Sequence, residues 1–232
     1  MFYCKCSQCP DCVINDSAIF KDLLHENRED LCSFLFLTKF HKKQIVALED
    51  NPSQNIYIAK TGKFKSYKLL DSGKQQIIRV YERGDILNLN SLCEPYYTES
   101  VEAITEAETC TINKVAFESF LERNPKMSFE LVKILTKELS SAYQTIRDLG
   151  QKNARSRVAG YLISCIDVKE HESRSVSIPL TLSRVEIANT IGVTQETLIR
   201  LFSKLKEEKI IDIDENHNVI IKNIPRLLKI AR

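Results

Sequence analysis

Residues Leu182–Lys206 read LSRVEIANTIGVTQETLIRLFSKLK and predict two short helices joined by a tight turn. Ser183 fits the N-cap of the first helix, and Glu186 three residues later completes the pattern of a capping box. Gly192 follows that helix, at a position where a left-handed backbone suits glycine. Thr194 fits the N-cap of the second helix. This stretch therefore predicts a helix-turn-helix in the C-terminal part of the chain.

The second helix separates apolar from polar side chains. Apolar residues recur at helical spacing at Leu198, Leu201 and Leu205. Glutamate accepts a hydrogen bond from cytosine N4, and arginine bridges guanine O6 and N7, so a polar face that starts with Gln, Glu and Arg suits the major groove. The residues expected to contact DNA are Gln195, Glu196, Thr197, Ile199, Arg200, Ser203 and Lys204. The alternative is a small helical hairpin with a solvated polar face.

The segment that follows predicts a β-hairpin. Residues 209–222 read KIIDIDENHNVIIK, which places two apolar runs around a polar turn. A hairpin directly after the second helix is the wing of a winged helix, and a wing lies against the DNA backbone. The hairpin therefore favours the DNA-binding interpretation over the solvated helical pair.

Composition limits the remaining possibilities. The chain has 232 residues, of which 43% are hydrophobic, and this suits one large domain or two ordinary ones. The net charge is only +2, so we expect any DNA-binding surface to be local. No apolar run is long enough to span a membrane, and the N-terminus lacks the apolar core of a signal peptide. We expect a cytoplasmic protein that does not contact the membrane.

The N-terminus concentrates thiols. It reads MFYCKCSQCPDC and carries Cys4, Cys6, Cys9 and Cys12 in a C-x-C-x2-C-x2-C pattern. In a reducing compartment such spacing indicates metal or redox chemistry rather than a disulfide frame. Soft sulfur ligands select zinc, copper(I) or iron–sulfur clusters. The alternative is a disordered tail of oxidisable thiols.

The middle of the chain changes from helix to strand. Residues 19–40 are predicted to be helical, with leucines on one side. From residue 41 to about 112, the runs QNIYIAK, FKSYKLL, QQIIRVY and TCTI are rich in β-branched and aromatic residues. Gly62, Gly73 and Gly84 mark turns between them. The pattern predicts a small antiparallel barrel or sandwich.

Residues 117–149 are predicted to return to helix, followed by a helix over 154–166 and a polar link over 169–175. After Asn124-Pro125 the apolar or small residues approximate a heptad seam. A narrow apolar stripe on a long helix favours a partner helix, and the alternative is packing against the chain's own domain. Gly150 is expected to end or bend the helix. The seam consists of Leu131, Leu135, Leu139, Ala142, Ile146 and Leu149.

The order of cysteines, barrel, long helix and winged helix resembles the CRP/FNR family of bacterial transcription regulators. QKNARSRVAGYL, the helix-turn-helix and the wing carry the resemblance, together with Glu196, Thr197 and Arg200 of its E-T-x-x-R signature and the barrel segments TGKFKSY and SGKQQIIRVYERGDIL. It implies an α+β fold with a jelly-roll, cyclic-nucleotide-binding-like barrel, and a non-enzymatic homodimer that binds palindromic double-stranded DNA and RNA polymerase. The implied parts are a cysteine-rich segment (1–18), a sensor barrel (19–124), a dimerisation helix (125–150) and a winged-helix domain (151–232).

The resemblance also bears on the signal. Cyclic-nucleotide binders of this family hold the cyclic phosphate with an Arg-Ser pair. Here the corresponding stretch, residues 96–103, reads YYTESVEA and contains no arginine. Because a phosphodiester needs a cationic partner, cyclic AMP is not the expected ligand.

The oxygen-sensing FNR branch holds a [4Fe–4S] cluster with N-terminal cysteines and one from the barrel. By this resemblance Cys110 matches the barrel cysteine, and Cys9 and Cys12 match its C-x2-C pair. The branch has a further cysteine shortly after the pair, but VINDSAIF has none, so the fourth thiolate falls to Cys6, with Cys4 as the alternative. The other cysteines, Cys32, Cys93 and Cys165, are expected to be ordinary buried residues, with Cys93 as the reserve ligand.

Other signals remain open at this point. A regulator of the same fold could sense zinc, thiol oxidation, a haem-bound gas or a small ligand. Haem needs axial ligands, and the histidines show no pairing that favours it: His25, His41, His171 and His217. A redox enzyme is disfavoured, because no G-x-G-x-x-G follows a strand and no nucleophile–base pair stands out.

Overall fold

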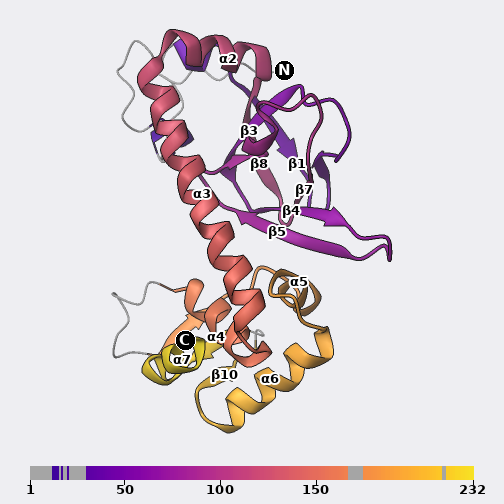
Figure 1. Cartoon of the computed structure of the whole chain (residues 1–232), viewed down its shortest axis with the longest axis vertical. Helices are drawn as coiled ribbons and strands as arrows, with labels where there is room; N and C mark the ends of the chain where they lie inside the picture. The colour runs from indigo at the N-terminus through magenta and orange to yellow at the C-terminus, as the bar shows by residue number, and fades with distance from the viewer. Residues whose placement is uncertain (1–11, 16, 18–19, 21–29, 167–174, 216–217) are drawn as a thin grey trace. The chain divides into compact units, whose positions relative to one another are not determined.

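The computed structural model describes residues 12–15, 17, 20, 30–166, 175–215 and 218–232. The chain divides into two compact units, Met1–Leu139 and Ser140–Arg232 (Figure 1). The predicted cysteine-rich segment and the polar link lie largely outside the described residues, as do His25, His171 and His217.

The first unit contains two four-stranded antiparallel sheets. One has the order β1-β8-β3-β6 and the other the order β2-β7-β4-β5. The predicted antiparallel barrel is thus confirmed, and the predicted turns at Gly62, Gly73 and Gly84 all have positive φ. The strands are β1 (Phe36–Phe40), β2 (Ile45–Ala47), β3 (Asn55–Thr61), β4 (Phe64–Leu69), β5 (Gln75–Tyr81), β6 (Ile86–Leu87), β7 (Ser100–Ala103) and β8 (Ala107–Asn113).

The prediction of helix over residues 19–40 is wrong at its C-terminal end. Residues 30–33 are helical, but Phe36–Phe40 forms β1, which pairs with β8 from Phe36 opposite Thr111 to Phe40 opposite Ala107. The leucines of this stretch look helical in isolation. Pairing with β8 satisfies the backbone polar groups and overrides that local periodicity.

The sheet that contains β3 and β8 is buried on both faces, and successive side chains alternate between them. Tyr57, Ala59 and Ala107 point into the barrel interior, among Phe64, Tyr81 and Leu87. The opposite face belongs to a second cluster, called here the outer cluster. Its members include Cys12, Val13, Ile14, Phe20, Leu31, Cys32, Leu35, Ile56, Ile58, Cys110, Ile112, Phe117, Phe120, Leu121, Met127 and Leu131.

Two helices follow the barrel. Helix α2 (Lys114–Arg123) starts directly after β8, where the Asn113 side chain accepts a hydrogen bond from the backbone N–H of Val115 at 3.0 Å. Helix α3 (Pro125–Gln151) continues past Gly150 to Gln151. Phe117 and Phe120 of α2, with Met127 and Leu131 of α3, complete the outer cluster.

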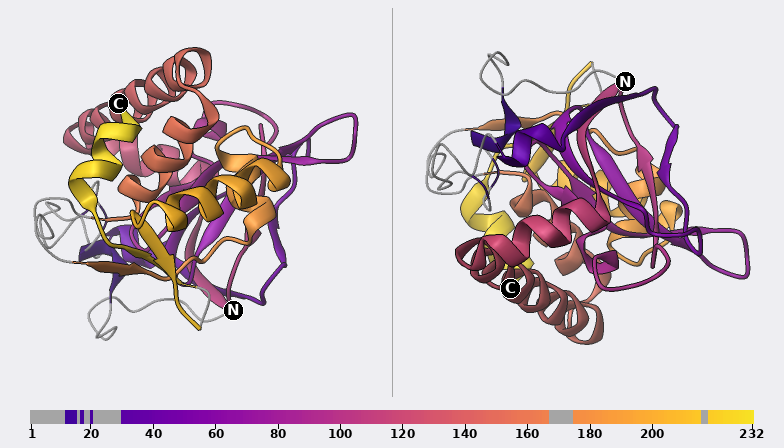
Figure 2. Two further views of the ribbon diagram at one scale, coloured as in Figure 1. Left: turned by 90° about the horizontal axis from the view of Figure 1, so that it is seen from below. Right: turned by 90° about the horizontal axis from the view of Figure 1, so that it is seen from above.

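The second unit is a winged helix (Figure 2, left). It contains α4 (Ala154–Ser164), α5 (Arg184–Thr190), α6 (Gln195–Glu207) and α7 (Ile224–Ala231). The predicted hairpin is present as β10 (Ile211–Ile213) and β11 (Val219–Ile221). Helix α7 and strand β9 (Val176–Ile178) were not predicted. Strand β9 pairs with β11 and completes a three-stranded sheet.

Candidate functional site

The predicted caps hold the helix-turn-helix. The backbone N–H of Ser183 donates to Glu186 Oε2 at 2.9 Å, and the backbone N–H of Glu186 donates to Ser183 Oγ at 3.3 Å, which completes the capping box. The Thr194 hydroxyl accepts from the backbone N–H of Thr197 at 3.3 Å and starts α6. Gly192 has a φ of 65°, as its position in the turn predicts.

Arg157 of α4 holds the turn between the two helices, a role that sequence reasoning missed. Its Nε donates to the carbonyl of Ile191 at 2.9 Å, and its Nη2 donates to the carbonyl of Gly192 at 3.1 Å. Its Nη1 donates to the carbonyl of Lys152 at 2.8 Å. The guanidinium thus fixes where α5 ends and, through the turn, where α6 begins. The local sequence RSRVAGYL could not predict this contact, because the carbonyls of Ile191 and Gly192 lie far from Arg157 along the chain.

Helix α6 presents the predicted polar face. Thr197 is half-buried, and the other residues expected to contact DNA are exposed: Gln195, Glu196, Ile199, Arg200, Ser203 and Lys204. Leu198 and Leu205 are buried as predicted. Leu201 is only half-buried, and Phe202, which the sequence analysis overlooked, takes the core position instead, with Arg184 4.5 Å above its ring.

Asp212 connects α6 to the wing. Its carboxylate lies 3.0 Å from Lys206 Nζ at the end of α6 and 2.5 Å from Lys222 Nζ after β11. Hydrogen bonds from Lys222 and Lys206 hold the pKa of Asp212 well below its usual range. The wing therefore starts at a defined place relative to the helix that presents Arg200.

The predicted seam on α3 is mostly exposed within one chain. Its first member, Leu131, is buried in the outer cluster, so the expectation that Leu131 faces a partner is wrong. Exposed Val132 occupies the corresponding place, three residues before Leu135. The exposed large apolar residues of this helix are Phe129, Val132, Leu135, Leu139, Tyr143, Ile146 and Leu149. These exposed residues form a stripe at approximately heptad spacing, called here the apolar stripe.

Two of the predicted cluster ligands, Cys12 and Cys110, are buried in the first unit. Cys12 is 8% exposed and Cys110 is 2% exposed, and both belong to the outer cluster. Cys110 lies on β8 between Leu37 of β1 and Ile58 of β3. Cys4, Cys6 and Cys9 lie outside the described residues. Within the described ranges, no three His, Cys, Asp or Glu side chains are grouped closely enough to hold a single metal ion.

Two of the three remaining cysteines differ from their expected burial. Cys93 and Cys165 are exposed, so both are wrongly predicted as buried. Cys93 follows the short helix η3 (Leu89–Ser91), and its place as reserve ligand stays a prediction. Cys32 is 4% exposed and belongs to the outer cluster.

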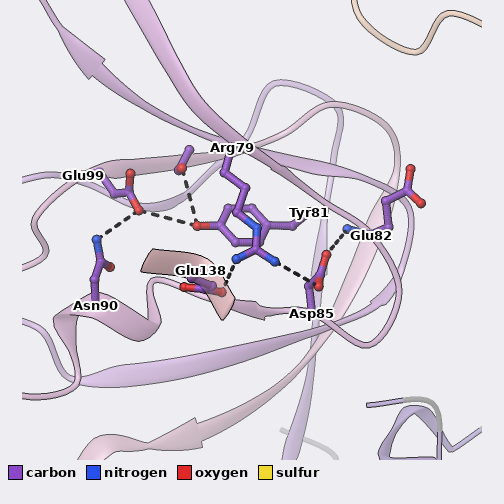
Figure 3. A network of polar contacts seen from close by, with 8 residues as sticks. Arg79, Tyr81, Glu82, Asp85, Asn90, Glu99 and Glu138 are labelled. Atoms are coloured by element: carbon purple, nitrogen blue, oxygen red, sulfur yellow. Dashed lines mark hydrogen bonds and ion pairs between the residues drawn. The ribbon is translucent and has the colours of Figure 1, made fainter. Parts of the chain in front are cut away.

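The stretch expected to correspond to the family's cyclic-phosphate site carries the buried carboxyl group of Glu99 (Figure 3). Glu99 is 5% exposed, and its Oε1 lies 3.3 Å from Asn90 Nδ2 and 3.5 Å from the Tyr81 hydroxyl. Burial raises the pKa of the Glu99 carboxyl above its ordinary value.

Arg79 extends this network from the barrel to α3 (Figure 3). Its guanidinium lies 4.9 Å from the centre of the Tyr81 ring. One nitrogen pairs with Asp85 at 3.2 Å, and another pairs with Glu138. The two carboxylates raise the pKa of Arg79 against the opposing effect of its burial, which is the largest single influence.

The two halves of the chain match two known domain families. Residues 37–124 match the cyclic nucleotide-binding domain, and residues 156–230 match the Crp-like helix-turn-helix domain. The nitrogen fixation regulation protein FixK of Bradyrhizobium diazoefficiens is 30% identical over 209 residues, which cover 88% of this chain and 86% of that protein. The chain belongs to the CRP/FNR family. It is a DNA-binding transcription regulator rather than an enzyme.

The chain is also similar to other regulators of the CRP/FNR family. The anaerobic regulatory protein of Haemophilus influenzae is 24% identical over 227 residues, which cover 96% of this chain and 87% of that protein. The solved structure of FixK2 from Bradyrhizobium japonicum superposes with a TM-score of 0.76 at 26% identity, over 85% of this chain and 98% of that chain. In the described part of this CRP/FNR chain, no helix combines the length and apolarity needed to cross a membrane.

Proposed function

We propose that this regulator is switched by an oxygen- or redox-sensitive [4Fe–4S] cluster in its first unit. The observation that carries the proposal is that Cys12 and Cys110, far apart in sequence, are buried in one apolar cluster. Buried thiols with apolar neighbours suit a cluster that must be shielded from water. The similarity to an anaerobic regulatory protein supports a signal related to oxygen.

The ligand assignment starts from the two buried thiols, Cys12 and Cys110. A cubane places each thiolate on a different iron atom. Cys12 and Cys110 would hold two irons, and the N-terminal cysteines Cys9 and Cys6, with Cys4 as the alternative to Cys6, remain proposed for the others. When bound, the cluster supplies chemistry that responds to oxidants.

The proposed DNA contacts follow from the exposed face of α6. Arg200 and Glu196, four residues apart on that face, read a G·C pair in each half-site of a palindrome. Ile199 lies on the same face and offers apolar contact to a thymine methyl group. Thr197, Gln195, Ser203 and Lys204 supply further polar contacts along the groove. By family resemblance RNA polymerase is a further partner.

The proposed route from the cluster to DNA is α3. The outer cluster joins Cys110 to Met127 and Leu131 in the first turns of that helix. Farther along, α3 presents the uncovered apolar stripe, which we propose pairs with the same stripe of a second copy. Cluster loss would loosen the base of the helix, and a few kcal/mol of differential stability is enough to shift a two-state equilibrium almost completely. Sedimentation of cluster-loaded and cluster-free protein measures this effect on dimerisation.

An anaerobic absorption spectrum of the purified protein, with iron and acid-labile sulfide assays, tests the proposed cofactor. Broad absorbance in the visible region with matching iron and sulfide supports the cluster. A Soret band would instead indicate haem. A colourless protein that contains zinc, or no metal, would overturn the cluster and leave zinc, thiol oxidation or a small ligand as the signal.

A further inference from the structure

Two lysines share one carboxylate at the C-terminal end of α6. Lys206 Nζ lies 3.0 Å from Asp212 Oδ1, and Lys222 Nζ lies 2.5 Å from Asp212 Oδ2. The lysine side chains are 54% and 46% exposed, so solvent reaches both of them. Two positive charges against one negative charge leave this group, called here the lysine pair, with an excess positive charge.

Lys206 belongs to the face of α6 that is proposed to contact DNA. It follows Ile199 by seven residues and Ser203 by three, so the three side chains form one row along the helix. All three are exposed. The row of proposed DNA contacts therefore ends in a cation.

The hairpin brings Lys222 to the same place. Asp212 of β10 pairs with Ile220 of β11, and Lys222 is two residues beyond Ile220 on the same side of the hairpin. The backbone N–H of Lys222 donates to the carbonyl of Ile210 at 2.8 Å, which extends the pairing to this residue. Asp212 thus draws one ammonium group from the helix and one from the wing toward a single point.

We propose that Lys206 and Lys222 together bind a phosphate of the DNA backbone, an inference that rests on the proposed DNA contacts of α6. A phosphate is an anion, which ammonium groups bind as point charges. Contacts to phosphates fix the position of a protein on the duplex and carry no sequence information. The lysine pair holds α6 and the wing on the backbone, while Arg200 and Glu196 discriminate between bases.

The test measures how the affinity of the full chain for an operator selected from random DNA changes with salt, by fluorescence anisotropy. The double variant Lys206→Gln with Lys222→Gln keeps long side chains and removes both charges. The slope of log affinity against log salt should become shallower by about 0.9 for each half-site, because one phosphate is no longer neutralised. The affinities for the operator and for an unrelated duplex should fall by the same factor. Lys206→Arg with Lys222→Arg should keep the wild-type slope.

Two controls separate a phosphate site from general electrostatics. Adding Asp212→Asn to the double glutamine variant removes the carboxylate that is left without its lysines, and the slope should stay shallow. Arg226→Gln with Lys229→Gln removes two positive charges from α7 of the same unit and should leave the slope unchanged. Circular dichroism melting checks that each variant folds, and the single glutamine variants serve if the double one does not.

Three results would overturn the phosphate site. They are an unchanged slope in the glutamine variants, an equal loss of slope in the α7 control, and a wild-type slope restored by Asp212→Asn. A loss of affinity confined to the operator would show that the lysines read bases, which also contradicts the proposal. In each case the DNA contacts proposed for α6 stand if Arg200→Ala still lowers the discrimination between the two duplexes, and they fail if it does not.

Discussion

The guanidinium of Arg79, on β5 of the barrel, pairs with the carboxylate of Glu138 on α3. The same guanidinium contacts the ring of Tyr81, whose hydroxyl lies 3.5 Å from the buried Glu99 (Figure 3). A continuous set of contacts therefore joins Glu99 of the barrel to the helix that carries the apolar stripe. Sequence spacing alone could not reveal it, because Arg79 and Glu138 are far apart along the chain.

We expect Arg79 and Glu138 to be energetically coupled. A double-mutant cycle with Arg79→Ala and Glu138→Ala should give a coupling free energy of about 1 kcal/mol, because both side chains are only one-third exposed and share further contacts. Urea unfolding provides the measurement. The matched control is the pair Lys133 and Glu130, which lies within α3 and should give about 0.2–0.5 kcal/mol. A coupling no larger than that of the control would contradict the role of Arg79 in fixing α3.

Glu99→Gln should make stability less dependent on pH. Burial raises the pKa of Glu99, so the folded chain holds this proton more tightly than the unfolded chain does. Wild-type stability should therefore fall as the pH rises from the unfolded pKa of about 4.3 through the raised folded pKa. The glutamine variant carries no such proton and should be the more stable protein above that window, as urea unfolding at several pH values can show.

Glu106→Gln is the control for the sign of this effect. A hydrogen bond from the backbone N–H of Lys42, followed by one from His41, lowers the pKa of Glu106. This group therefore adds stability above its unfolded pKa, and the stability is lost as the pH falls through the folded value. Equal pH profiles for Glu99→Gln and the wild type would show that the Glu99 carboxyl is not held in a desolvated state.

Arg157→Ala should destabilise the second unit by about 1–3 kcal/mol, because three backbone carbonyls lose a charged donor. Its DNA affinity should fall as well, since the turn that positions α6 is no longer fixed. Arg157→Lys should restore little, because an ammonium group lacks the planar fork that reaches the carbonyls of both Ile191 and Gly192. Thermal unfolding and fluorescence anisotropy with DNA check both effects. If Arg157→Ala is as stable as the wild type, Arg157 does not hold the turn between α5 and α6.

Arg200→Ala should lose about 1–3 kcal/mol of discrimination between an operator selected from random DNA and an unrelated duplex. The exposed Arg200 lies on the face of α6 that also presents Glu196, whereas Lys229 is an exposed cation on a different helix, α7. Lys229→Ala is therefore the control, and it should leave the ratio of the two affinities unchanged. If Arg200→Ala also binds both duplexes in the wild-type ratio, Arg200 does not read a base pair.

The elements with strong local signals could be predicted from sequence. The capping box of Ser183 and Glu186, the cap at Thr194 and the positive φ of Gly192 follow from neighbouring residues, and the structure contains all of them. The longer strands were found for the same reason, since β-branched and aromatic residues fill them. These features depend on contacts a few residues apart.

Features fixed by distant partners could not be predicted. Strand β1 depends on β8, and β9 depends on β11, so neither run signals a strand alone. Leu131 is apolar at heptad spacing, yet its side chain is buried in the outer cluster and so cannot contact a partner helix. The shared burial of Cys32 with Cys12 and Cys110 likewise needs the folded chain, because no spacing rule connects residues so far apart.

The proposed iron–sulfur cluster is expected to control DNA binding. The most direct test is the affinity for the selected operator, measured by anaerobic fluorescence anisotropy on one preparation before and after removal of the cluster. We expect the cluster-loaded protein to bind about 5–150-fold more tightly, which is the usual range of coupling between two sites. Equal affinities of the loaded and cluster-free forms would contradict the account and leave the N-terminal cysteines without a sensing role.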